Sequence, residues 1–536
     1  MKLNHPLVLF VSVLSFVFIQ SAQAKRFVFN PNQETKWIGD KTAALKINEY
    51  VKQQFAIKAE VPVFIILKQQ ADLSQVAKIA DRNQRITAIY QKLVAHANQT
   101  QGGVMSLITK ASVPYQRYFI SNSILIVKAN RALVEQIALL PEVKKVIGNP
   151  SVAMSQPVPS AAPVNSSGSS MTSGFESIFN LRSSTITGVG ENITSLKVDK
   201  VWEELGAEGK GIVVAGQDTG VQWDHPALIN QYRGWNGTQA NHDYNWHDSV
   251  HFYYNPEGSA SRCGYNSAVP CDDGDHGSHT MGTIVGSDGA ENKIGVAPKA
   301  KWISCRNMDG GFGNPSSYLE CFQFFLAPTP VTGDPFLTGR PDLAPHVINN
   351  SWGCPKVEGC DGDEMIPALQ VMKAAGIMVV VSAGNDGPNC STIQDAPAHN
   401  VDLVFTVGAY NHRTGSIADF SSRGPSKLNG LAGPDVAAPG VSIRSSVPGS
   451  RYDQAMWSGT SMAGPHVAGE VALLWSANPA LIGKIDETAN LIRKTATPKT
   501  TTQACGTNVS GSFPNNVYGY GNIQPYEAVK AALGIN

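Results

Sequence analysis

The sequence has no cysteine in its first 262 residues, and none of its cysteines forms a C-x-x-C pair. Without such pairs a structural zinc site is disfavoured. Their even number instead favours disulfides if the chain reaches an oxidising compartment. Cys263 with Cys271 and Cys354 with Cys360 would close the shortest loops, but spacing alone leaves the connectivity open. The remaining cysteines are Cys305, Cys321, Cys390 and Cys505.

Charged residues are also scarce, at 16% of the chain against 42% hydrophobic residues. This balance argues against global disorder and allows a large packed core. With 536 residues, the chain is too long for one ordinary domain. No later apolar run approaches the ~20 residues of a membrane span. No basic patch carries interleaved aromatic residues, so we expect neither a membrane anchor nor a nucleic-acid partner.

The N-terminus has the layout of a cleaved secretory signal over residues 1–24. Lys2 provides a basic start, Leu7 to Ile19 form an apolar run, and Ala22-Gln23-Ala24 is a small-x-small ending. The apolar run is too short for a membrane span. We therefore expect the protein to be secreted, to an extracellular or periplasmic space.

Residues 25–150 predict a small α+β unit of ferredoxin-like order. Strand-like segments at 61–68, 122–129 and 143–148 alternate with helical patterns at 71–96 and 131–140. Residues 151–190, rich in Ser, Pro, Gly and Ala, then predict an exposed, flexible linker that a protease could cut.

Charge is divided unevenly between the two ends of the chain. Residues 1–190 contain 20 Lys and Arg against 9 Asp and Glu, whereas the remainder contains 22 against 33. Opposite net charges favour attraction between the two parts.

From about residue 195, near-continuous apolar runs alternate with helical patterns. Such runs are typical of strands buried on both faces of a parallel sheet, and the alternation predicts a doubly wound α/β domain over residues 191–536. We expect strands at 211–218, 300–305, 346–353, 377–385 and 402–409, and helices at 276–286, 315–326, 364–375 and 460–475.

Three polar residues stand where such a domain places reactive groups. Asp218 ends an expected strand, His276 leads into an apolar helix, and Ser461 starts another helix. An imidazole can take the proton of a serine hydroxyl, and a carboxylate can fix the imidazole tautomer. Each residue alone is more often a cap or a packed group, so their order and local sequences must decide.

Those local sequences resemble the signatures of subtilisin-like serine peptidases, the subtilases. "DTG", "HGSH" and "GTSMAGPHVAG" occur in the Asp–His–Ser order known from subtilisin. "VVVSAGNDGP" is similar to the segment of the family's oxyanion-hole asparagine, and "NNSWG" to its substrate-binding strand. "DTGVQWDHPAL", "GVAPKAKWI" and "VSIRSSVPG" look closest to the bacillopeptidase F-like branch. Residues 60–150 resemble the family's inhibitory propeptide.

The resemblance implies a serine endopeptidase made as an autoinhibited zymogen. Ser461 would attack the peptide carbonyl and form an acyl-enzyme, with His276 as general base and acid and Asp218 orienting it. Asn385 and the Ser461 N–H would hold the oxyanion. An extended peptide would pair with the backbone of one strand edge, formed by Ser351, Trp352 and Gly353. The other wall of the pocket would be formed by Ser382, Ala383 and Gly384.

The expected partners are polypeptide substrates and the chain's own propeptide as an intramolecular inhibitor, and we expect a monomer. No cofactor is expected for catalysis. Structural calcium is compatible with the acidic stretches Asp272–Asp275 and Cys360–Glu364, but the sequence assigns no ligands. The stretch "CDDGDHGSHTMG" contains two histidines that could act as the general base. His276 matches the first histidine of the family's H-G-x-H motif and leads into the helix, so the resemblance implies that it is the base and that His279 supports the fold.

Three other functions fit the sequence less well. An α/β-hydrolase esterase needs a G-x-S-x-G elbow, but Ser461 lies in G-T-S-M-A and the order of the three residues differs. A metallohydrolase of the H-E-x-x-H type lacks its motif. A binding protein on an inactive peptidase scaffold is disfavoured because all four catalytic positions hold competent residues.

Overall fold

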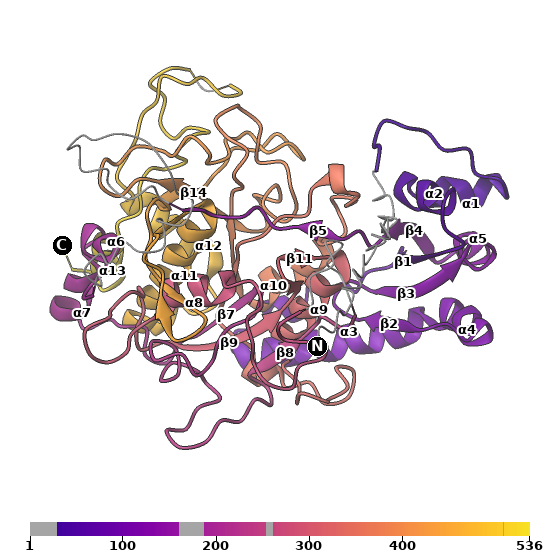
Figure 1. Ribbon diagram of the computed structural model, residues 1–536, viewed down its shortest axis with the longest axis horizontal. Helices are drawn as coiled ribbons and strands as arrows, with labels where there is room; N and C mark the ends of the chain where they lie inside the picture. The colour runs from indigo at the N-terminus through magenta and orange to yellow at the C-terminus, as the bar shows by residue number, and fades with distance from the viewer. Residues whose placement is uncertain (1–28, 160–186, 253–260, 508, 536) are drawn as a thin grey trace, which may run out of the picture.

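The computed structural model describes residues 29–159, 187–252, 261–507 and 509–535. The expected secretory signal and most of the expected linker therefore lie outside the described residues. The chain forms a smaller N-terminal unit and a larger C-terminal unit, which lie side by side (Figure 1). None of the helices described is both long and apolar enough to cross a membrane.

The larger unit is built on a seven-stranded parallel sheet in the order β15-β14-β13-β12-β7-β9-β8. Its central strands are buried, as their continuous apolar runs predict. This confirms the α/β fold class. The strands are β7 (Val213–Asp218), β8 (Trp246–Asp248), β9 (Lys301–Arg306), β12 (Val347–Asn350), β13 (Met378–Ser382), β14 (Phe405–Tyr410) and β15 (Val436–Pro439).

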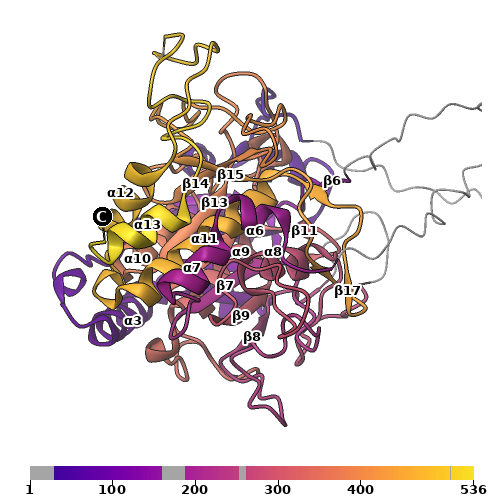
Figure 2. The same ribbon diagram turned by 90° about the vertical axis from the view of Figure 1, so that its left-hand side faces the viewer.

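Helices cover both faces of this sheet (Figure 2). One face packs against α8 and α11, with α7, α12 and α13 behind them. The other face packs against α9 and α10. The bounds are α6 (Glu191–Ser195), α7 (Val198–Leu205), α8 (His276–Val285), α9 (Pro315–Leu326), α10 (Ile366–Ala375), α11 (Thr460–Ala477), α12 (Ile485–Thr495) and α13 (Pro525–Ala532).

The N-terminal unit is a four-stranded antiparallel sheet in the order β2-β3-β1-β4, with helices between its strands. The order is the ferredoxin-like one. The elements are α1 (Lys41–Lys46), α2 (Glu49–Phe55), β1 (Glu60–Leu67), α3 (Arg82–Thr100), α4 (Gly102–Ala111), β2 (Tyr115–Tyr118), β3 (Ser123–Asn130), α5 (Arg131–Leu139) and β4 (Val143–Gly148).

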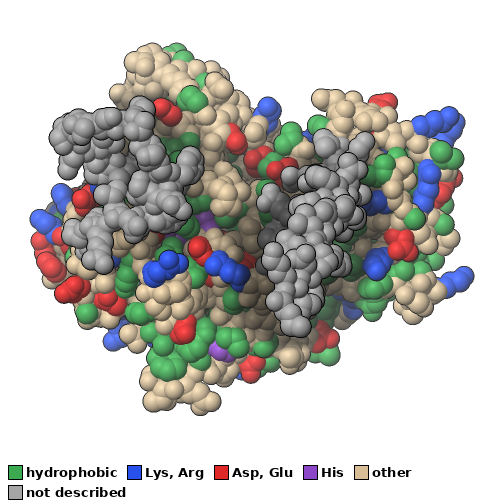
Figure 3. All heavy atoms as spheres, in the orientation of Figure 1, with side chains coloured by type: hydrophobic (Ala, Val, Ile, Leu, Met, Phe, Trp, Pro, Cys, Tyr) green, Lys and Arg blue, Asp and Glu red, His purple; other side chains and the backbone are tan. Residues whose placement is uncertain are grey.

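The two faces of this small sheet serve different cores. Alternate side chains such as Val63 and Ile65 pack within the N-terminal unit, whereas Phe64 and Leu125 join a core that continues into α9 and α10 of the larger unit. Because successive strand residues face opposite sides, β1 contributes to both cores at once. In the space-filling view the unit forms its own lobe beside the larger one (Figure 3).

The first part of the expected linker is not an exposed tether. Residues Val152–Ala153 form β5, which pairs with β11 (Phe312–Gly313), and Val158–Pro159 form β6, which pairs with β18 (Trp457–Ser458). Val152 and Met154 are buried. Apolar side chains at alternate positions let this stretch add to existing strand edges, so it crosses the larger unit as an extended strap, visible at β5 in Figure 1.

All eight cysteines form disulfides, which confirms the interpretation from their even number. The two neighbouring pairs are joined as their short loops suggest. The bonds are Cys263–Cys271, Cys305–Cys321, Cys354–Cys360 and Cys390–Cys505.

Candidate active site

Asp218 and His276 form a buried pair at the carboxyl-terminal ends of the sheet's strands. Asp218 is the last residue of β7, and His276 is the first of α8. The His276 Nδ1–H donates to both carboxylate oxygens of Asp218 at 2.9 Å, and the imidazole is fully buried. Nε2 has no hydrogen-bond partner within the described ranges. The carboxylate thus fixes the tautomer that leaves Nε2 able to accept a proton.

Two glycines allow this pair to form. A Cβ on Gly220 would lie 1.8 Å from the carbonyl oxygen of Cys271, and one on Gly277 would lie 1.9 Å from that of Gly220. Gly220 also has φ +103°, which other residues rarely adopt. The turn after β7 and the start of α8 therefore approach more closely than side chains would permit.

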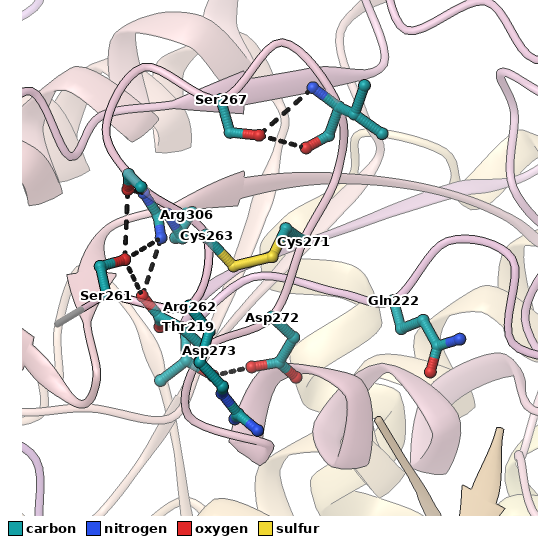
Figure 4. Close-up of a disulfide and its surroundings, with 12 residues drawn as sticks. Thr219, Gln222, Ser261, Arg262, Cys263, Ser267, Cys271, Asp272, Asp273 and Arg306 are labelled. Carbon is teal, nitrogen blue, oxygen red and sulfur yellow. Dashed lines mark hydrogen bonds and ion pairs between the residues drawn. A yellow bond between two sulfur atoms is a disulfide. The ribbon is translucent and has the colours of Figure 1, made fainter. Parts of the chain in front are cut away.

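The aspartates before His276 bind protein groups through hydrogen bonds and ion pairs, and the surroundings of Asp272 and Asp273 are drawn in Figure 4. Asp272 accepts hydrogen bonds from Thr219 Oγ1 and from the Ser278 backbone N–H at 2.7 and 2.8 Å, which caps α8. Asp273 pairs with the buried Arg306 at 2.8 Å. Asp275 pairs with the exposed Arg262. These three aspartates are thus committed to folding the loop that presents His276.

His279 is packed, not available for chemistry. It is fully buried, its ring stacks on Trp457 at 4.6 Å, and its Nε2 contacts the carbonyl of Ile443 at 3.2 Å. Burial lowers the pKa of its imidazole. This position agrees with the supporting role expected from the sequence.

Ser461 lies in the first turn of α11, which packs against α8. Its hydroxyl donates to the carbonyl oxygen of Ser351 at 3.2 Å. The hydroxyls of Ser351 and Ser382 donate to the backbone carbonyls of Ser461 and Thr460, at 3.2 and 2.8 Å. The ends of β12 and β13 therefore hold the turn that carries this hydroxyl.

Asn385 is oriented by the residue before the serine. Its Oδ1 accepts hydrogen bonds from the backbone N–H and the hydroxyl of Thr460, both at 2.9 Å. Because the Thr460 N–H can only donate, the amide oxygen must face it and Nδ2 must point the other way. Nδ2 lies near the backbone N–H of Ser461, since a Cβ built on Gly459 would be 3.7 Å from both nitrogens, and it is free to donate on that side.

The expected substrate-binding residues lie around this serine, but their side chains are mostly not in contact with solvent. Trp352 is 5% exposed and stacks on Tyr318 at 3.9 Å, so its ring belongs to the core. Ser382 and Ala383 are also buried. The backbone of these segments, together with Gly353 and Gly384, is the part left to meet a peptide.

A second acidic group could hold a cation. Ligand oxygens of Asp361, Asp363 and Glu364 lie within 4.8 Å of one another. The ammonium of Lys145, from the N-terminal unit, contacts Asp361 and lies 3.8 Å from Asp363. Burial and the neighbouring carboxylates raise the pKa of Glu364 to about 7. Lys145 therefore supplies the positive charge opposite these carboxylates, and calcium binding by the loop of residues 360–364 remains a prediction.

Sequence reasoning missed the strap. Its Ser- and Pro-rich surroundings suggested a linker, and only the spacing of Val152 and Met154 signals a pairing strand. The strap pairs with β18, which ends three residues before Ser461, and with β11, which precedes α9, so its second pairing lies next to the turn that carries Ser461.

Comparisons with known proteins agree with this geometry. A family model described as the subtilase family matches residues 209–521. Bacillopeptidase F of Bacillus subtilis (strain 168) is 33% identical over 97% of this chain. Subtilisin E of the same strain is 33% identical over 43% of the chain, and its serine protease AprX is 29% identical over 60%.

The matched region covers only part of each of these relatives. The alignments cover 35% of bacillopeptidase F, 54% of subtilisin E and 66% of AprX. It therefore spans about a third of the length of bacillopeptidase F and about half to two thirds of the other two.

Proposed function

The chain belongs to the subtilase family, and we propose that it is a secreted serine endopeptidase made as an autoinhibited zymogen. The observation that carries this proposal is the buried Asp218–His276 pair, whose Nε2 has no hydrogen-bond partner among the described residues, at the start of a helix that packs against the helix carrying Ser461. No catalytic cofactor is needed for this chemistry. The sequence pattern expected of a secretory signal over residues 1–24 supports export.

The proposed reaction uses Ser461 as nucleophile. When a peptide carbonyl enters, the Ser461 hydroxyl turns from the Ser351 carbonyl toward His276, whose Nε2 takes its proton. The resulting imidazolium is stabilised by Asp218 and returns the proton to the leaving amine. Water then releases the acyl group by the same steps.

Asn385 and the Ser461 backbone N–H are proposed to hold the oxyanion. The Thr460 bonds fix the Asn385 amide before the substrate arrives, so no reorganisation is needed during the reaction. One such donor lowers the barrier by about 3–4 kcal/mol, a magnitude established on subtilisin itself.

Residues 25–150 are proposed to be the inhibitory propeptide. Contacts of several kinds join this unit to the larger one: the guanidinium of Arg82 donates to the Pro345 carbonyl at 2.6 Å, and Tyr90 Oη donates to the Pro335 carbonyl at 2.9 Å. The strap then passes along the edges that an extended substrate would use, since it already adds strands there. Cleavage between residues 151 and 190 would free the cleft.

A labelling experiment tests the proposal. A fluorophosphonate probe should label Ser461 of the processed protein, and Ser461→Ala should abolish both labelling and casein hydrolysis while the full-length chain accumulates. Ser416→Ala, at an exposed serine outside the site, is the control and should keep activity. Casein hydrolysis that survives Ser461→Ala would overturn the assignment.

A further inference from the structure

The Asp395 carboxylate lies beside Gly353, in the segment of residues 351–353 that is proposed to bind the peptide backbone. The backbone N–H of Cys354 donates to the Ala396 carbonyl at 2.8 Å, which brings the segment after β12 against residues 395–396. A Cβ built on Gly353 would lie 3.4 Å from the Asp395 Cβ and 3.8 Å from its Oδ2. The absence of a side chain at Gly353 thus leaves this carboxylate uncovered on that side.

The opposite wall is acidic as well. A Cβ on Gly384 would lie 3.8 Å from Oδ2 of Asp386, which is exposed. Gly384 immediately precedes Asn385, so this wall starts at the proposed oxyanion donor. Gly353 leaves ordinary contact space next to Asp395, whereas a Cβ on Gly384 would first meet the Ser422 hydroxyl at 2.8 Å, with the Asp386 carboxylate beyond it.

The Asp395 carboxylate has no cation or hydrogen-bond donor in the parts of the chain that the structure describes, although it is partly buried. Burial, together with the Asp386 and Glu358 carboxylates, raises the pKa of Asp395 to about 7. A partly buried carboxylate without a donor is unfavourable, and a cationic side chain would supply the missing partner.

We propose that Asp395 selects lysine or arginine as the substrate residue before the scissile bond. This inference rests on the proposed peptidase function and names its substrate class. The long basic side chain would pass between Gly353 and Gly384 and place its cation on Asp395, with Asp386 adding negative charge at the other wall.

The sequence of the connecting segment agrees with such a preference. Between Lys145 and Lys197 the only basic residue is Arg182, which lies outside the described residues but within the expected processing region. An enzyme that requires a basic residue would cut the connection at one bond only, Arg182–Ser183. The mature chain should therefore begin at Ser183.

The test uses the processed enzyme and quenched peptides that differ only before the cut. Lys and Arg peptides should exceed Leu and Phe peptides in kcat/KM by on the order of 100-fold, the size expected for a desolvated charge pair. Asp395→Asn should remove most of this ratio without changing fluorophosphonate labelling. Asp402→Asn, which alters an exposed carboxylate, is the matched control and should keep it.

N-terminal sequencing of the wild-type product tests the inference without relying on the Asp395 variant. Ser183 as the first residue, and loss of that cut in Arg182→Leu, would support it. A preference for Leu or Phe, or an unchanged cut in Arg182→Leu, would overturn it while leaving the peptidase assignment intact. If Ser461 is not labelled and no peptide is cut, the proposed function itself fails.

Discussion

The side-chain oxygen of Gln323, on α9, accepts a hydrogen bond from the backbone N–H of Phe119 at 2.8 Å. The next N–H, of Ile120, reaches the same oxygen at 3.4 Å. All three residues are buried. One acceptor of the larger unit thus provides the hydrogen-bond partner of two buried backbone N–H groups that follow β2 in the N-terminal unit.

Replacing this acceptor should weaken the proposed inhibition. Gln323→Leu leaves two buried N–H groups without a partner, at a cost of about 1–3 kcal/mol, so the lag before peptidase activity appears should shorten by on the order of 10-fold. Gln323→Glu keeps an acceptor and is the matched control. A lag in Gln323→Leu equal to that of the wild type would argue against a docking role.

Asp218→Asn should reduce kcat by about 10⁴-fold with little change in fold, because the amide favours the wrong imidazole tautomer. Steady-state hydrolysis of a quenched peptide measures the loss, and fluorophosphonate labelling should slow in parallel. Asp224→Asn changes an exposed carboxylate six residues later and should be silent. An Asp218→Asn enzyme with near wild-type kcat would remove Asp218 from the mechanism.

Two aspartates of the stretch before His276 should differ in their effect on stability. Asp273→Asn breaks a buried pair with Arg306 and should cost about 3 kcal/mol. Asp275→Asn removes an exposed pair with Arg262 and should cost less than about 1 kcal/mol. Thermal midpoints in the Ser461→Ala background, which prevents self-digestion, compare the two. Equal midpoints would contradict the structural role of Asp273.

Glu470, within α11, should make stability depend on pH. It is fully buried, and neither carboxylate oxygen has a partner among the residues described. Burial raises its pKa from 4.5 to about 8. Between these values the folded state holds a proton that the unfolded chain has lost, so its contribution to stability falls as pH rises from 4.5 to 8.

Glu470→Gln cannot titrate, and it should gain on the wild type as pH rises. Thermal midpoints at pH 5 and pH 8.5, again with Ser461→Ala, measure the difference. The wild type should lose more on going to pH 8.5. Parallel pH dependence in both proteins would show that Glu470 finds a partner when ionised.

The sequence predicted the long elements well because their hydrophobic patterns are local. The expected helix at 315–326 has those bounds, and the strand at 211–218 differs only at its start. The three-residue β8 and the strand β15, with sequence VAAP, carry too little pattern to be recognised. The expected helix from 71 begins only at Arg82, where Asp81 caps it.

For the candidate site, motif order predicted which residues approach one another, and Asp218 and His276 are in contact. What each acidic side chain binds could not be predicted, because the partners are far away in sequence. Arg306 meets Asp273 across 33 positions, and Lys145 meets Asp361 across 216. Asp395 belongs to no recognisable motif, and only the fold brings it beside Gly353.

The small sheet that contributes alternate side chains to two cores has a consequence for irreversibility. If the N-terminal unit is cut away, Phe64 and Leu125 and the faces of α9 and α10 that they cover would meet water. The larger unit would then retain an apolar surface that it did not have to expose while folding. Once processed and then unfolded, the larger unit would therefore not be expected to refold unless the N-terminal unit were supplied again.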